Sequence, residues 1–123
     1  MLFRSTKQEL LNKVEIVDGI NFIGEVVDVN NADALKKLCF DLKPALQNYF
    51  VVLAANLDGK ASVAILIDDA VVASKNLEAP KIIKEHVAPL IKGGGGGKKT
   101  LATAGGQDAS NLPQVIEKVK RLL

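Results

Sequence analysis

The sequence of 123 residues has few of the residue types from which common active sites are built. It contains one histidine, one cysteine and no tryptophan, and aromatic residues make up 4% of it. A lone cysteine, Cys39, excludes an internal disulfide, and its spacing with neighbouring leucines predicts a buried thiol. A lone histidine, His86, has no nearby ligand or orienting partner in sequence. We therefore expect no catalytic residue and no metal site, and a surface position for His86.

Long apolar runs are also absent. The first residues, Met1 to Ser5, lack the apolar segment and cleavage site of a secretory signal. These features predict a cytoplasmic protein that makes no contact with a membrane. With 48% hydrophobic residues, the chain has enough apolar side chains for one core of ordinary domain size.

The small net charge of +2 hides an uneven distribution. Residues 1–80 carry eight Lys/Arg against eleven Asp/Glu, a net −3, whereas residues 81–123 carry eight against three, a net +5. A basic excess confined to one part of a chain favours a polyanionic partner, although a solvated basic face without function has the same composition.

Two Asp-Gly dipeptides predict tight turns between β-rich segments. The first, Asp18-Gly19, separates residues 14–17 from residues 20–29, and the second lies in the turn 57–60 between residues 49–56 and 61–67. The last two segments are almost continuously apolar, which is typical of central strands with both faces covered. Residues 68–76 are expected to form a loop.

Helical spacing of apolar residues predicts three helices. The first follows the possible caps Asn30 and Asn31 and is kinked by Pro44, the second spans residues 80–91 and ends at Gly93, and the third spans 112–123 after a cap at Asn111. A weaker helix is expected over residues 5–13. The predicted fold is an α/β single small domain with a mixed β-sheet covered by helices and a short N-terminal helix.

Five consecutive glycines, Gly93 to Gly97, are the most unusual feature of the sequence, and Lys98, Lys99 and Thr100 follow them. Glycine loses more conformational freedom on folding than any other residue, so such a run needs an offsetting function. Only one helix follows, and its apolar stripe needs the same core, which favours a loop within the domain over a linker. Bare backbone amides beside lysines suit the phosphates of a nucleic acid.

Two nucleotide-binding patterns do not fit this segment. The P-loop pattern would need glycine in place of Lys92 and a hydroxyl residue in place of Lys99, and it should follow a strand. The dinucleotide pattern G-x-G-x-x-G meets a lysine at its third glycine.

The adjacent carboxylates Asp68 and Asp69 are the best candidate pair for acid–base catalysis. Adjacent residues at the end of a strand point apart, however, which suits a solvated loop better than catalysis.

The string Gly95-Gly96-Gly97-Lys98-Lys99-Thr100-Leu101-Ala102-Thr103-Ala104-Gly105-Gly106 resembles the glycine-rich signature of the DHH-associated domain at the C-terminus of alanyl-tRNA synthetases. Residues 51–62, with their Asp-Gly-Lys turn, and Ala88-Pro89-Leu90-Ile91 are similar to that domain too. The resemblance covers residues 18–123. It leaves residues 1–17 as a helical leader, either frayed or, as the resemblance implies, the end of a longer helical linker.

The resemblance implies a non-catalytic domain that binds the outer corner of tRNA, alanine-specific tRNA being expected, and that in some relatives aids dimerisation. The expected binding residues are Lys92, Gly94, Gly95, Gly96, Gly97, Lys98, Lys99 and Thr100. The family commonly has arginine and then proline after the glycines, where this chain has Lys98 and Lys99, so a bidentate arginine contact is lost. No cofactor is expected in this domain, since ATP, Mg²⁺ and Zn²⁺ would serve other domains of the parent enzyme.

Two alternatives stay open from the sequence. One is the substrate-binding lobe of a DHH-family phosphoesterase or exonuclease, in which histidine typically follows the glycines where this chain has Lys98. The other is a dimerisation module. The low aromatic content argues against base stacking and favours recognition of the shape and backbone of a folded RNA.

Overall fold

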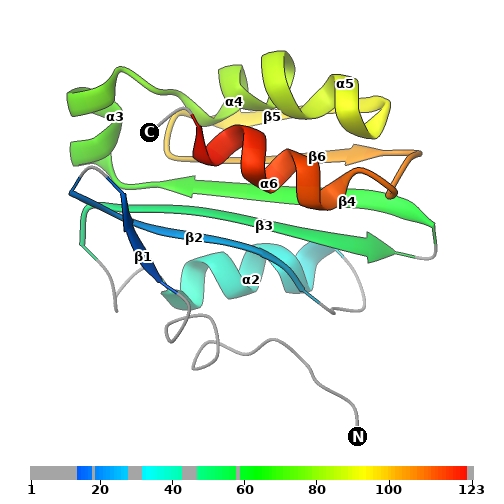
Figure 1. The fold of residues 1–123 in the computed structure, drawn as a ribbon, viewed down its shortest axis with the longest axis horizontal. Helices are drawn as coiled ribbons and strands as arrows, with labels where there is room; N and C mark the ends of the chain where they lie inside the picture. The colour runs from blue at the N-terminus through cyan, green and yellow to red at the C-terminus, as the bar shows by residue number, and fades with distance from the viewer. Residues whose placement is uncertain (1–13, 18, 28–31, 43–46, 58, 122–123) are drawn as a thin grey trace, which may run out of the picture.

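The computed structural model describes residues 14–17, 19–27, 32–42, 47–57 and 59–121. Six strands form one mixed sheet in the order β1-β2-β3-β4-β6-β5, and helices lie on both of its faces (Figure 1). The strands are β1 (Glu15–Val17), β2 (Ile20–Val26), β3 (Tyr49–Leu57), β4 (Lys60–Ile67), β5 (Gly93–Lys98) and β6 (Leu101–Gly106). The helices are α2 (Ala32–Leu42), α3 (Asp69–Lys75), α4 (Ala79–Ile82), the π-helical η2 (Ile83–Val87), α5 (Ala88–Ile91) and α6 (Leu112–Lys120). The predicted α/β class with a mixed sheet is confirmed.

Both predicted Asp-Gly turns join antiparallel strands. Gly19 and Gly59 have the positive φ angles of 78° and 89° that glycine adopts without steric cost. They connect β1 to β2 and β3 to β4. The end of the predicted leader, residues 15–17, therefore belongs to the sheet, while the helix expected over residues 5–13 lies outside the described residues.

The sheet separates two apolar clusters. Strands β2 and β3 pair in parallel, and α2 makes the crossover between them. On the α2 face, this helix packs across β3 and β4. The opposite face is covered by α4, η2, α5 and α6 (Figure 1). Strands β3 and β4 lie in the centre with buried side chains on both faces, as their continuous apolar sequences predicted.

The first predicted helix is confirmed over the described part, Ala32–Leu42. Its inner face buries Leu35, Cys39 and Leu42 against the sheet. Burial raises the pKa of the Cys39 thiol to about 12, because the thiolate would have no solvent around it. The expected caps Asn30 and Asn31 and the kink at Pro44 lie outside the described residues.

Residues 69–75 form the helix α3, so the prediction of a loop there is wrong. Asp68 caps it: the Asp68 side chain accepts hydrogen bonds from the amides of Ala70 at 3.4 Å and Asn48 at 2.7 Å. A capped helix this short needs little amphipathic pattern, and only Val71 is buried in it. This absence of an apolar stripe explains why periodicity missed it.

The helix predicted over residues 80–91 is three pieces, α4, η2 and α5, in continuous succession. Pro89 cannot donate a hydrogen bond to the preceding turn, and the Ala88 amide donates to the carbonyl of Ile83, five residues back, in the wider π-type geometry. Lys92 ends the segment with a φ of 55°, so Lys92 and not Gly93 is the left-handed residue that ends the helix.

The last helix, α6, spans Leu112–Lys120 with Pro113 in its first turn and buries Val115 and Val119. Asn111 precedes it but makes no side-chain capping hydrogen bond, and its side-chain amide donates to the carbonyl of Leu90 at 3.1 Å. This hydrogen bond fastens the start of α6 to the end of α5.

Candidate nucleic-acid interface

The glycine run is not a loop but the edge strand β5, and this corrects the prediction from the sequence. Residues 93–98 pair antiparallel with β6, and Lys99 and Thr100 form the two-residue turn between the strands. Glycine carries no side-chain pattern from which a strand could be recognised. All six residues of β5 are exposed. An edge strand leaves every second backbone amide and carbonyl without a strand partner, so β5 presents bare polar backbone to solvent.

Alternate glycines of β5 have different reasons to be glycine. A Cβ atom on Gly93, Gly95 or Gly97 would overlap the backbone of β6, where for Gly95 it would lie 2.5 Å from the Cα of Ala104. The fold therefore requires glycine at these positions. A Cβ on Gly94 or Gly96 would meet nothing within 4 Å, so packing within this domain leaves their identity unexplained.

Gly94 and Gly96 face the same side of the sheet as α2. Residues directly opposite each other in an antiparallel pair share a face. Lys98 pairs with Leu101, which packs on the α2 cluster, and Gly96 pairs with Thr103 two residues further along. The two glycines that the fold does not require thus lie on the face that α2 covers only in part.

A groove of about 350 Å³ runs on this face between α2 and the β5–β6 hairpin. It exists because α2 packs on β3 and β4 and leaves β6 and β5 uncovered beside it. We call it the glycine groove. Its lining residues are Lys36, Phe40, Leu66, Gly96, Gly97, Lys98, Thr100, Leu101, Ala102 and Thr103.

The hairpin that forms one wall of the groove is held at its tip. The amide of Ile67 donates to the carbonyl of Thr100 at 2.7 Å, and the amide of Ala79 donates to the carbonyl of Lys99 at 3.0 Å. The turn is therefore fastened to the end of β4 and to the start of α4. This anchoring fixes the backbone of the turn next to Lys98.

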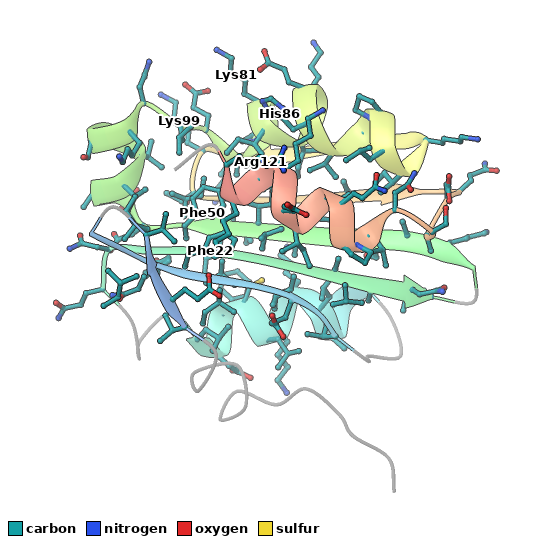
Figure 2. The ribbon with its side chains drawn as sticks, viewed as in Figure 1. Phe22, Phe50, Lys81, His86, Lys99 and Arg121 are labelled. Carbon is teal, nitrogen blue, oxygen red and sulfur yellow. The ribbon has the colours of Figure 1, made fainter. Side chains whose placement is uncertain are left out.

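The predicted binding residues do not all meet at one place. Gly96, Gly97, Lys98 and Thr100 line the glycine groove, whereas Lys99 projects on the side of the sheet that α4 covers (Figure 2). Lys92 precedes β5 and so lies at the opposite end of the strand from Lys98. The adjacent residues Lys98 and Lys99 thus lie on different faces of the sheet.

Two lining residues were missed by sequence reasoning. Lys36 and Phe40 are one turn apart on α2 and lie off its buried stripe. Phe40 is 46% exposed, whereas Leu35 and Leu42 on the same helix are 1% and 0% exposed. The available signal was an aromatic residue outside the apolar periodicity, but nothing in the sequence links residue 40 to residues 96–98.

Among the described residues, the charge that lines the glycine groove is entirely positive. Its two ionisable lining side chains are Lys36 and Lys98, and no carboxylate of the described ranges lines it. A larger groove of about 640 Å³ lies between β2 and α6, but Glu15, Glu25 and Glu117 line it together with Lys120 and Arg121. Mixed charge, with Lys120 paired to Glu15 and Arg121 to Glu117, makes that groove a poorer receptor for a polyanion.

Near the start of β5, a carboxylate lies close to Lys92. The pKa of Asp108 is lowered by hydrogen bonds from the Ser110 hydroxyl and amide and by the charge of Lys92. An ionised Asp108 near Lys92 offsets part of the charge of that lysine. No carboxylate stands beside Lys36 or Lys98 among the described residues that line the groove.

The histidine and the candidate metal ligands lie outside the glycine groove. His86 belongs to η2, on the face opposite α2 (Figure 2). Its side chain is only 27% exposed, so it is half-buried and not the surface residue that we expected. Its Nδ1 is buried and has no hydrogen-bond partner among the described residues. Over the described ranges, no three His, Cys, Asp or Glu side chains gather to hold a metal ion, and no helix has the length and apolarity to cross a membrane.

Comparison with known proteins gives a consistent result. The DHHA1 domain family matches residues 19–123. Alanine–tRNA ligases of Cytophaga hutchinsonii and Christiangramia forsetii are 39% and 32% identical over 120 residues, which is 98% of this chain. The chain spans only 14% of the length of each of these enzymes.

Solved structures show the same fold. The C-Ala domain from Aquifex aeolicus alanyl-tRNA synthetase superposes with a TM-score of 0.79 and 26% identity, covering 90% of this chain and 97% of that one. A DHH domain from a member of a family of ribosomal proteins has a TM-score of 0.61 at 18% identity, covers 93% of this chain and 28% of that one, and shows likeness of fold alone. By the match over residues 19–123, the chain belongs to the DHHA1 domain family, in the form that alanyl-tRNA synthetases carry.

Proposed function

We propose that this domain binds the sugar–phosphate backbone of a folded RNA through the glycine groove, and that the RNA is tRNA, held at its outer corner for the alanyl-tRNA synthetase to which the domain corresponds. The observation behind the proposal is the position of Gly96, Gly97 and Lys98 beside Lys36 in a groove that no described carboxylate lines. Its work would be in the cytoplasm, with ATP and metal ions needed only by other parts of such an enzyme.

The chemistry of the groove suits an anion such as phosphate. By the register with β6, the amides of Gly95 and Gly97 point out of the sheet edge, and the absence of side chains on Gly94 and Gly96 lets a ligand approach them closely. Lysine supplies point charges without the planar geometry of arginine. Such a surface attracts a line of phosphates and reads no base sequence.

A titration of the chain with tRNA at two salt concentrations tests this function. Binding that weakens steeply as salt rises is expected, because each neutralised phosphate releases counterions. Lys98→Ala should weaken binding and reduce the slope of log K against log salt by about 1. Lys36→Ala should act similarly, since Lys36 lines the same groove.

Matched controls come from lysines that lie outside the groove. Lys99→Ala removes the same charge one residue further along the chain, and Lys118→Ala removes it from exposed α6 on the opposite face. Both variants should change affinity and slope less than Lys98→Ala. Equal effects of all these substitutions would show that only net charge matters and would remove the groove from consideration.

A further inference from the structure

Phe40 adds an aromatic ring to the α2 wall of the glycine groove, opposite Lys98 on the hairpin wall. The ring lies on α2, while Gly96, Gly97, Lys98 and Thr103 come from the facing hairpin. Single exposed apolar residues are common on protein surfaces, so the 46% exposure of Phe40 alone carries no meaning. The significant observation is the position of Phe40 in a groove that also holds two lysines and an edge strand without side chains.

The composition of the groove decides which ligand suits it. A free phosphate would use Lys36 and Lys98 but leave Phe40 in water, and an apolar peptide would cover Phe40 but bury the charge of both lysines. A nucleotide suits all three side chains, because its flat aromatic base can cover Phe40 and its anionic phosphate can contact the lysines. Stacking of a base on an aromatic side chain tolerates any base, since each base presents a π face.

The size of the groove narrows the ligand further. A volume of about 350 Å³ lies at the lower end of sites for small ligands, which span about 300–1,000 Å³. It has room for a single nucleotide and not for a double helix. A base can enter only if it is unstacked, as in the loops of a folded RNA.

We propose that the glycine groove takes one unpaired nucleotide of the bound RNA, with its base stacked on Phe40 and its phosphate against Gly96 and Lys98. This inference rests on the proposed function and adds to it a requirement for an unpaired base. Lys36, one turn before Phe40 on α2, lies on the same wall and would contact the adjoining phosphate. The groove would thereby distinguish looped RNA from continuous duplex.

The test compares Phe40→Leu with Phe40→Tyr on two RNA probes of equal phosphate number, a hairpin with an unpaired loop and a blunt duplex. Loss of a stacked base corresponds to about 1–3 kcal/mol, so Phe40→Leu should weaken hairpin binding roughly 5- to 150-fold. The tyrosine variant should retain most of the affinity, because it keeps the aromatic face. Duplex binding and the salt slope should stay unchanged in both variants, since no charge is removed.

A fluorescent base analogue in the hairpin loop gives a second readout, because stacking on Phe40 alters its emission on binding. That change should be seen with the wild-type and tyrosine proteins and be absent with leucine. Equal hairpin binding by the wild-type, Phe40→Leu and Phe40→Tyr proteins overturns this inference. The same result is expected if Phe40 contacts another protein and not a base. If the wild-type chain binds neither RNA, the proposed function fails; if binding depends on Lys98 but not on Phe40, only this inference fails.

Discussion

Gly95 and Ala104 are paired across β5 and β6 so closely that a Cβ on Gly95 would lie 2.5 Å from the Cα of Ala104. The next residue, Gly96, pairs with Thr103, and a Cβ there would meet nothing within 4 Å. Two neighbouring glycines of one strand therefore have different constraints. Gly95 is set by the fold, and Gly96 is free to be set by what binds in the groove.

This difference predicts opposite effects of one methyl group on stability. Gly95→Ala forces the backbones of β5 and β6 apart and should lower the free energy of unfolding by about 1–3 kcal/mol or more. Gly96→Ala points the methyl into open space and should change it by less than about 0.5 kcal/mol. Urea denaturation of the two variants measures this directly. Similar losses in both would mean that the pairing of β5 with β6 is not as close as described.

The same substitution at Gly96 should impair binding of tRNA without impairing the fold. A methyl group on Gly96 would project into the groove beside the free amides of Gly95 and Gly97 and hold a phosphate away from them, and a lost hydrogen bond of about 0.5–1.5 kcal/mol corresponds to roughly a 2- to 10-fold weaker affinity. The salt slope should not change, because the charge is unaltered. A titration of the stable Gly96→Ala variant with tRNA checks this expectation, and undiminished affinity would argue against contact of the RNA with the backbone beside Gly96.

The parts of the fold that were predictable are those in which side chains report their surroundings. The continuous apolar run 61–67 identified a central strand, and Gly19 and Gly59 marked turns that need positive φ angles. Residues 69–75 and 93–98 were missed for the converse reason. The first is a short capped helix with one buried side chain, and the second has five residues with no side chain at all.

The site was predictable only in part because it depends on packing between distant segments. Lys98 could be identified from its glycine neighbours, but Lys36 and Phe40 join it only because α2 covers β3 and β4 and stops short of β6. Equally, sequence could not show that Lys98 and Lys99 project to different sides of the sheet. Local patterns give strands and helices; the face to which a turn residue projects is set by the tertiary structure.

Asp68 is expected to stabilise the junction between the start of β3 and the start of α3. Its carboxylate accepts hydrogen bonds from the amides of Asn48 and Ala70, so it links the start of β3 to the start of α3. Asp68→Ala should lower the free energy of unfolding by about 0.5–2 kcal/mol, the usual cost of losing a helix cap. Asp69→Ala, one residue further along, is the control and should cost less. Thermal or chemical denaturation separates the two, and equal losses would show that the cap contributes nothing beyond charge.

The buried thiol of Cys39 predicts a loss of stability in alkaline solution. Burial raises its pKa from the ordinary 9.0 to about 12. Below pH 9 the thiol is protonated in both folded and unfolded chains and adds no pH dependence. Between pH 9 and 12 only the unfolded chain gives up the proton, so the free energy of unfolding falls by up to about 1.4 kcal/mol per pH unit from this group. Cys39→Ala is less stable at neutral pH because it leaves a small cavity, but it cannot titrate, so its stability should fall less steeply above about pH 9. Urea denaturation of both proteins at about pH 8 and about pH 10.5 measures the difference, and parallel losses would show that the thiol ionises as readily in the folded protein as in the unfolded chain.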